Sequence, residues 1–178
     1  YVYKERNIFV ESIKFGVKKM KALYPLHIAI MLIIIGTQVY QWCNGGNPDW
    51  ALLGTQTLAQ IFLVHTWVPV ENIYFSLNGV AWYLSTSFFT YLYFPLILKF
   101  LRKLKTNKGA VIYAVVIFLI QVFVAFLTKY IFPISNQDHY YLTYICPYFR
   151  IGDFIIGCLL GKLFLNRKEV TVSIQKGT

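Results

Sequence analysis

Residues 110–132 read AVIYAVVIFLIQVFVAFLTKYIF, and this stretch decides the class of fold. About 20 mostly apolar residues, at roughly 1.5 Å rise each, form a helix long enough to cross a bilayer. Three other stretches have the same character, namely Leu23–Trp42, Val80–Leu101 and Leu142–Leu165. The sequence therefore predicts an all-α fold, a polytopic transmembrane bundle with four spanning helices, the third being Ala110–Phe132.

The composition excludes an ordinary soluble domain. Of 178 residues, 57% are hydrophobic and only 13% are charged, against roughly 25% charged in soluble domains. The formal net charge is +10, but the basic residues flank apolar segments instead of lining one polar face. We therefore expect the lipid bilayer to be the partner, and no nucleic acid.

The basic residues also predict the orientation of the helices. All of them except Lys129 and Arg150 fall within residues 4–21, 99–108 or 162–176. Short loops rich in Lys and Arg remain on the cytoplasmic side, so we predict a multi-pass protein of the plasma membrane with its basic segments inside. These cytoplasmic segments are residues 1–21, 99–109 and 166–178, and the last is a polar tail or linker.

This orientation requires residues 43–79 to begin and end outside. The apolar stretch Ala51–Val70 would break that parity if it crossed the membrane. Its Gln56, Gln60 and His65 favour a re-entrant or interfacial helix instead. The chain starts at Tyr1 without an initiator Met or a signal peptide, and is interpreted as a piece of a longer protein.

An arginine and an aspartate fall well inside the fourth predicted span, away from the basic cluster at its end. Arg150 and Asp153 are three positions apart and share one helix face. Charges at such depth are costly and typical of functional sites, although an ion pair near the outer interface would also explain them. Gly157 and Gly161 continue the stripe and would let another helix approach closely.

The second predicted span is rich in hydroxyl groups. Tyr83, Ser87 and Thr90 fall on one stripe at helical spacing, with Thr86 and Tyr93 beside it. Such a stripe either bonds neighbouring helices or lines a polar cavity.

Histidine and cysteine give weaker signals. His27 is near the inner end of the first span, where a histidine is more typical of a satisfied helix end than of a catalyst, although its pKa range suits proton transfer. Cys43 and Cys146 fall at outer helix ends, where they either pair or remain free with Cys158. Their spacing predicts no metal site.

Three stretches taken together resemble the acyltransferase 3 family of integral-membrane O-acyltransferases. They are KKMKALYPLH at residues 18–27, NGVAWYLSTSFFTYLYFP at 78–95 and YFRIGDFIIGCLLG at 148–161. The resemblance covers most of residues 1–165, which would form a partial domain. It implies transfer of an acyl group, usually acetyl from acetyl-CoA, to a hydroxyl of a cell-surface or exported carbohydrate, with no tightly bound cofactor.

The resemblance also implies roles for particular residues. The donor would be held by Lys18, Lys19 and Lys21, although the family's next basic residue falls at Ala22. The cavity wall would be formed by Trp82, Ser85, Ser87, Tyr91, Arg150 and Asp153, with Ser87 where many members have a carboxylate.

The family's catalytic histidine belongs to an earlier helix, so the remaining N-terminal helices of the same protein are an expected partner and His27 is a second choice as base. Without those helices we expect this piece to be inactive. Two alternatives are a transporter or channel subunit that uses Arg150 and Asp153 in a polar pathway, and a helix-packing subunit without chemistry.

Overall fold

The computed structural model describes residues 8–104 and 106–176, with side chains described from residue 10 to residue 166. All regular elements in these ranges are helical, as predicted. The longer helices are α1 (Ile8–Met20), α2 (Tyr24–Cys43), α3 (Trp50–Ile61), α5 (Trp82–Lys103), α6 (Asn107–Phe126) and α8 (Pro147–Lys176). The short elements are η1 (His65–Trp67), α4 (Glu71–Tyr74), η2 (Gly79–Ala81), η3 (Leu127–Ile131), α7 (Asn136–Tyr140) and η4 (Tyr141–Ile145).

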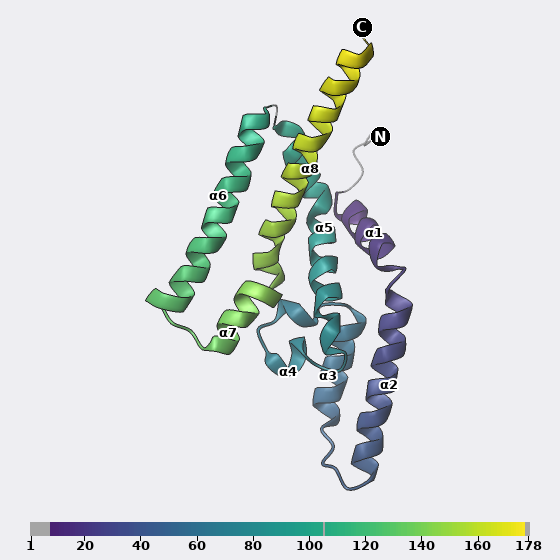
Figure 1. Cartoon of the computed structure of the whole chain (residues 1–178). Helices are drawn as coiled ribbons and strands as arrows, with labels where there is room; N and C mark the ends of the chain where they lie inside the picture. Colours follow the sequence, from purple (N-terminus) through teal and green to yellow (C-terminus); the bar gives the residue numbers. More distant parts are fainter. Residues whose placement is uncertain (1–7, 105, 177–178) are drawn as a thin grey trace.

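Helix α5 lies at the centre of the arrangement in Figure 1, with α1 on one side and α8 on the other. Helix α6 packs on the far side of α8, whereas α2 and α3 lie side by side and project beyond the end of α5. The contact of α5, α6 and α8 is filled by a cluster of small and aliphatic side chains. Its buried members are Ile97, Leu101, Ala110, Ala114 and Leu159.

Three helices among the described residues are long and apolar enough to cross a membrane. They are Tyr24–Cys43, Gly79–Lys103 and Asn107–Ile131, each within a few residues of a predicted span. Most of the Asn107–Ile131 surface is exposed to the surroundings, as expected for a helix whose neighbours include lipid.

The fourth predicted span differs from the structure at its start. Leu142–Leu165 is not one helix, because a π-helical turn, η4, ends at Ile145 and α8 begins at Pro147. The break falls at Cys146, whose ψ is 118°, since a residue before proline is disfavoured in the helical region. Arg150, Asp153 and Lys162 also raise the charge of α8, which is not among the three candidate spans.

The stretch Ala51–Val70 contains no continuous spanning helix. Helix α3 has 12 residues and is therefore about 18 Å long, shorter than the roughly 30 Å hydrocarbon core. Asp49 caps its first turn by accepting a hydrogen bond from the Leu52 amide at 2.9 Å. The chain then bends at Leu63, whose φ is 54°, before η1. A short helix was expected here, and its depth in a bilayer stays a prediction.

The C-terminal end of α5 is joined to the middle of α8 by a lysine. The Lys162 ammonium of α8 donates to the carbonyl oxygens of Leu101 and Leu104 at the end of α5. Helix C-termini leave such carbonyls without partners, and a cation there is stabilised by the helix dipole. The basic end of α5 and the residues around Lys162 therefore lie at the same level, whereas the side of the membrane that they face stays a prediction.

Some expectations concern parts of the chain that are only partly described. Residues 1–7, Lys105 and residues 177–178, which belong to the predicted cytoplasmic segments, lie outside the described residues. The segment predicted as a tail from residue 166 continues α8 as helix to Lys176. Cys43, Cys146 and Cys158 are all free, with Cys43 exposed and Cys146 buried.

Candidate functional site

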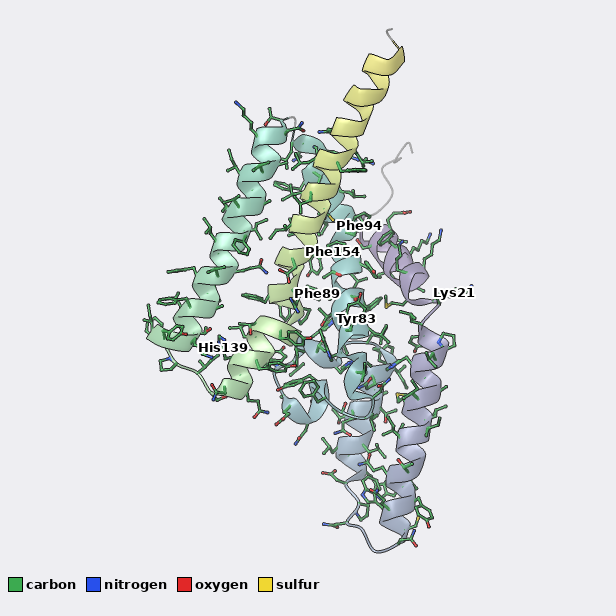
Figure 2. All side chains as sticks on the ribbon, in the orientation of Figure 1. Lys21, Tyr83, Phe89, Phe94, His139 and Phe154 are labelled. Atoms are coloured by element: carbon green, nitrogen blue, oxygen red, sulfur yellow. The ribbon has the colours of Figure 1, made fainter. Side chains whose placement is uncertain are left out.

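A cavity of about 490 Å³ lies between α5 and the first turns of α8. Both helices turn aromatic and polar side chains toward it, and in Figure 2 Tyr83 and Phe154 are labelled at this contact. Five of the six predicted cavity residues line it, and six further residues complete the wall. The full set is Trp82, Tyr83, Thr86, Ser87, Thr90, Tyr91, Arg150, Asp153, Phe154, Gly157 and Cys158.

Arg150 and Asp153 form an ion pair on the cavity wall, as their spacing predicted. The Arg150 Nη1 lies 2.7 Å from the Asp153 Oδ2, and the Arg150 Nε donates to the Tyr144 carbonyl at 2.9 Å. The guanidinium carbon also lies 5.0 Å from the centre of the Tyr144 ring. Side-chain exposure of 31% for Arg150 and 50% for Asp153 leaves the pair open to the cavity.

Gln121 holds the aspartate from the α6 side. Its Nε2 donates to the Asp153 Oδ1 and to the Phe149 carbonyl, both at 3.1 Å. A Cβ at Gly152 would lie 2.7 Å from that nitrogen, so glycine makes room for the amide. Sequence reasoning missed Gln121, although a lone amide within an apolar span was a usable signal.

The hydroxyl stripe of α5 divides into a packing part and a cavity part. Ser85 is fully buried away from the cavity, which corrects its predicted place in the wall. Its Oγ donates to the Leu63 carbonyl at 2.7 Å and accepts from the Thr66 hydroxyl at 2.8 Å. Thr86 donates to the Ile145 carbonyl at 2.9 Å, so it joins α5 to η4 while its side chain also borders the cavity.

Ser87 belongs to the cavity part of the stripe. In the described part of the chain its hydroxyl has no hydrogen-bond partner, whereas Thr90 donates to the Ser87 carbonyl at 2.9 Å. Ser87 is therefore a cavity hydroxyl whose donor and acceptor capacity are both unused, as are those of the Tyr83 and Tyr91 hydroxyls among the described residues. The ring of Tyr91 closes the neighbouring wall and lies 6.1 Å from that of Phe154.

The predicted donor residues Lys18 and Lys19 are on α1, which packs against the middle of α5, and Lys21 follows directly after this helix. Phe15 lies 6.0 Å from Tyr91 and 4.7 Å from Phe94, measured between ring centres. The Lys19 ammonium lies 5.6 Å from the Phe15 ring centre. Lys19 is thus separated from the cavity by two aromatic rings, those of Phe15 and Tyr91.

All three lysines are exposed, and none of them lines the cavity itself. Lys21 borders a second, apolar hollow of about 390 Å³ with Tyr24 and Phe88. Phe15 of α1 stacks on Phe94 of α5, and Phe94 precedes Lys103 by nine residues, or about 14 Å along the helix. This contact of α1 therefore lies well short of the basic end of α5.

His27 lies in a separate buried group and does not reach the cavity. It is 2% exposed, and its Nε2 lies 3.1 Å from the Gln60 carbonyl. Burial lowers the pKa of His65 to about 4, and electrostatic repulsion from the nearby His27 contributes to this shift. Neither ring nitrogen of His65 has a hydrogen-bond partner among the described residues, although the Ala81 and Ala59 backbone groups partly oppose this lowering of the pKa. These histidines are therefore separate from the cavity chemistry.

The described residues bring together no three His, Cys, Asp or Glu side chains that could hold a metal ion. The cavity instead offers hydrogen-bonding groups and aromatic faces from Ser87, Tyr91 and Trp82, beside one ion pair. Such a wall can bind and orient a hydroxylated ligand.

Comparison with known proteins gives one distant relative. Over 91 residues the chain is 26% identical to the acyltransferase MdmB of Streptomyces mycarofaciens. The match covers 51% of this chain and 23% of the relative, so the chain spans less than a quarter of that protein. No family model matches, and no solved structure matches. The chain is distantly similar to an acyltransferase, and this likeness supports acyltransferase as its general class.

Proposed function

We propose that this chain is part of a membrane-bound O-acyltransferase of the plasma membrane. It transfers an acyl group, acetyl in the simplest case, from acyl-CoA to a hydroxyl of a cell-surface or exported carbohydrate. The distant acyltransferase supports the reaction class. The observation that carries the rest is the contact of Phe15 with Tyr91, which brings the basic helix against the wall of the cavity.

The donor is a thioester with several phosphate charges, and we assign its anionic part to Lys18, Lys19 and Lys21. Lysine binds phosphate as a point charge and lacks the bidentate geometry of arginine. The three lysines are exposed on α1 and in the turn after it, and none forms an ion pair with a described acidic residue. The thioester end would then extend past Tyr91 into the cavity.

The acceptor hydroxyl would lie against Ser87 and Arg150. Its oxygen attacks the thioester carbonyl, its proton passes to a base, and the carbon–sulfur bond breaks with CoA leaving as the thiolate. Ser87, Tyr91 and the Trp82 indole N–H are donors available for the developing oxyanion. No histidine lines the cavity, and we place the base on an earlier helix, as the family resemblance implies.

The transporter alternative has less support. A charged solute pathway requires charged groups that are free to bind the solute. Arg150 is bonded to Asp153 and to the Tyr144 carbonyl, and Asp153 is bonded to Gln121. This network suits an orienting role better than a relay.

Transfer of radiolabelled acetyl from acetyl-CoA tests the proposal. Membranes containing the full-length protein are assayed with and without the endogenous surface polysaccharide, and label should appear in polysaccharide only when both are present. The double variant Lys18→Ala, Lys19→Ala should raise the KM for acetyl-CoA by roughly tenfold, from the loss of two charge-assisted contacts. An unchanged KM would exclude the assigned role of these lysines.

A further inference from the structure

The charges on the cavity wall cancel. In the part of the chain that the structure describes, Arg150 and Asp153 are the charged residues that line it. They form an ion pair with each other at 2.7 Å, so the wall has no net charge. Gln121 donates to Oδ1 of Asp153, the carboxylate oxygen that does not bind Arg150. This bond holds the carboxylate in its pairing with Arg150.

A carboxylate on the acceptor would disturb this balance. It would compete with Asp153 for the guanidinium and would lie beside the Asp153 charge in a half-buried site. Two carboxylates that share one cation leave a net negative charge, which is costly where water is partly excluded. A cationic acceptor would lie beside the Arg150 charge and leave a net positive charge in the cavity, which is costly for the same reason.

The rest of the wall suits uncharged hydroxyl groups. Ser87 has a free hydroxyl, and Trp82, Tyr83 and Tyr91 offer aromatic faces with a polar edge. Aromatic rings bind the C–H faces of sugars, while neutral donors and acceptors match the sugar hydroxyls.

We infer that this cavity selects an uncharged sugar as the acyl acceptor and rejects sugars that carry a carboxylate or an ammonium group. This selectivity rests on the proposed function, since it assigns the cavity to the acceptor. The selectivity runs against the overall electrostatic field of this chain, because its net charge of +10 attracts anions. A preference for the uncharged sugar therefore has to come from the cavity itself.

Three matched ligands test this inference. Full-length protein in phosphatidylcholine nanodiscs, which add no net charge, is mixed with methyl β-glucoside, methyl β-glucuronide or methyl β-glucosaminide at neutral pH. Binding is measured by saturation-transfer NMR, and acetyl transfer to each glycoside is measured separately. The glucoside should bind at least about tenfold more tightly than either charged ligand, as one unfavourable charge contact at intermediate dielectric predicts.

Two variants should change the order of preference. Asp153→Asn removes the negative partner of Arg150, so the guanidinium charge is no longer neutralised. The affinity for the glucuronide should then equal or exceed the affinity for the glucoside. Arg150→Gln leaves the Asp153 carboxylate without a cation, and the affinity for the glucosaminide should then equal or exceed the affinity for the glucoside. The matched control is Asp138→Asn, the same chemical change on α7 outside the cavity, and it should keep the preference of the unchanged protein.

The outcomes distinguish a failure of the inferred selectivity from a failure of the proposed function. Preference for glucoside without any acetyl transfer would retain the inferred selectivity and overturn the proposed function. Transfer with equal or better use of glucuronide would retain the function and overturn the selectivity. Absence of binding by all three glycosides, or the same response in Asp138→Asn as in Asp153→Asn, would also overturn the selectivity.

Discussion

Ser85 and Ser87 are two residues apart on α5 and should respond to alanine in opposite ways. Ser85 donates to the Leu63 carbonyl at 2.7 Å and accepts from the hydroxyl and the amide of Thr66 at 2.8 and 3.3 Å. Each buried hydrogen bond contributes about 1 kcal/mol. Ser85→Ala should therefore lower the free energy of unfolding by about 2–4 kcal/mol, because the bend at Leu63 and η1 lose their attachment to α5.

Ser87→Ala removes a cavity hydroxyl that has no partner among the described residues. It should change the free energy of unfolding by less than about 0.5 kcal/mol, since no hydrogen bond is lost, and lower the rate of acyl transfer by roughly a hundredfold, as the loss of one donor to the developing charge predicts. Both values come from the same preparation. Unfolding in mixed micelles is followed by circular dichroism during titration with dodecyl sulfate, and transfer is assayed at saturating acetyl-CoA. Equal destabilisation by the two changes, or normal transfer by folded Ser87→Ala protein, would refute the division of the stripe.

Three other predictions follow from the packing and the charges. Gly152→Ala places a Cβ 2.7 Å from the Gln121 amide nitrogen, and should cost about 1 kcal/mol of stability and reduce transfer, both measurable on the purified variant. His65 has a pKa of about 4 when folded, so the protein should lose up to about 3 kcal/mol of stability as pH falls from 6.5 to 4. His65→Gln should flatten that pH dependence in melting experiments, and an unchanged slope would contradict it. Single cysteines at Asn47 and Thr106 should be labelled from opposite sides of the membrane, and labelling from the same side would overturn the topology.

The helices with the strongest hydropathy were predictable from sequence because a local property defines them. The span predicted at Leu23–Trp42 is Tyr24–Cys43 in the structure, and Val80–Leu101 is matched by Gly79–Lys103. Periodicity also placed Arg150 and Asp153 on one face, and the structure pairs them. Hydrophobicity and helical spacing act within a few residues, so no tertiary contact was needed for these predictions.

The remaining features depend on contacts between distant residues. Ser85 and Ser87 are equally polar, and only the positions of Leu63 and Thr66 make Ser85 a packing residue. Likewise, Gln121 is 32 positions from Asp153, and no local pattern predicts their contact. The break before Pro147 is readable from the proline alone, and the predicted span Leu142–Leu165 ran through it.

The central claim is that the acyl donor reaches the cavity between α5 and α8 from the basic helix α1. A photoreactive acyl-CoA analogue, with the reactive group on its acyl chain, tests this claim in membranes that contain the full-length protein. After irradiation and peptide mapping, the label should fall on the cavity face of α5, around Ser87 and Tyr91, and excess acetyl-CoA should abolish it. Label on the exposed face of α6, or label that acetyl-CoA does not displace, would contradict the account.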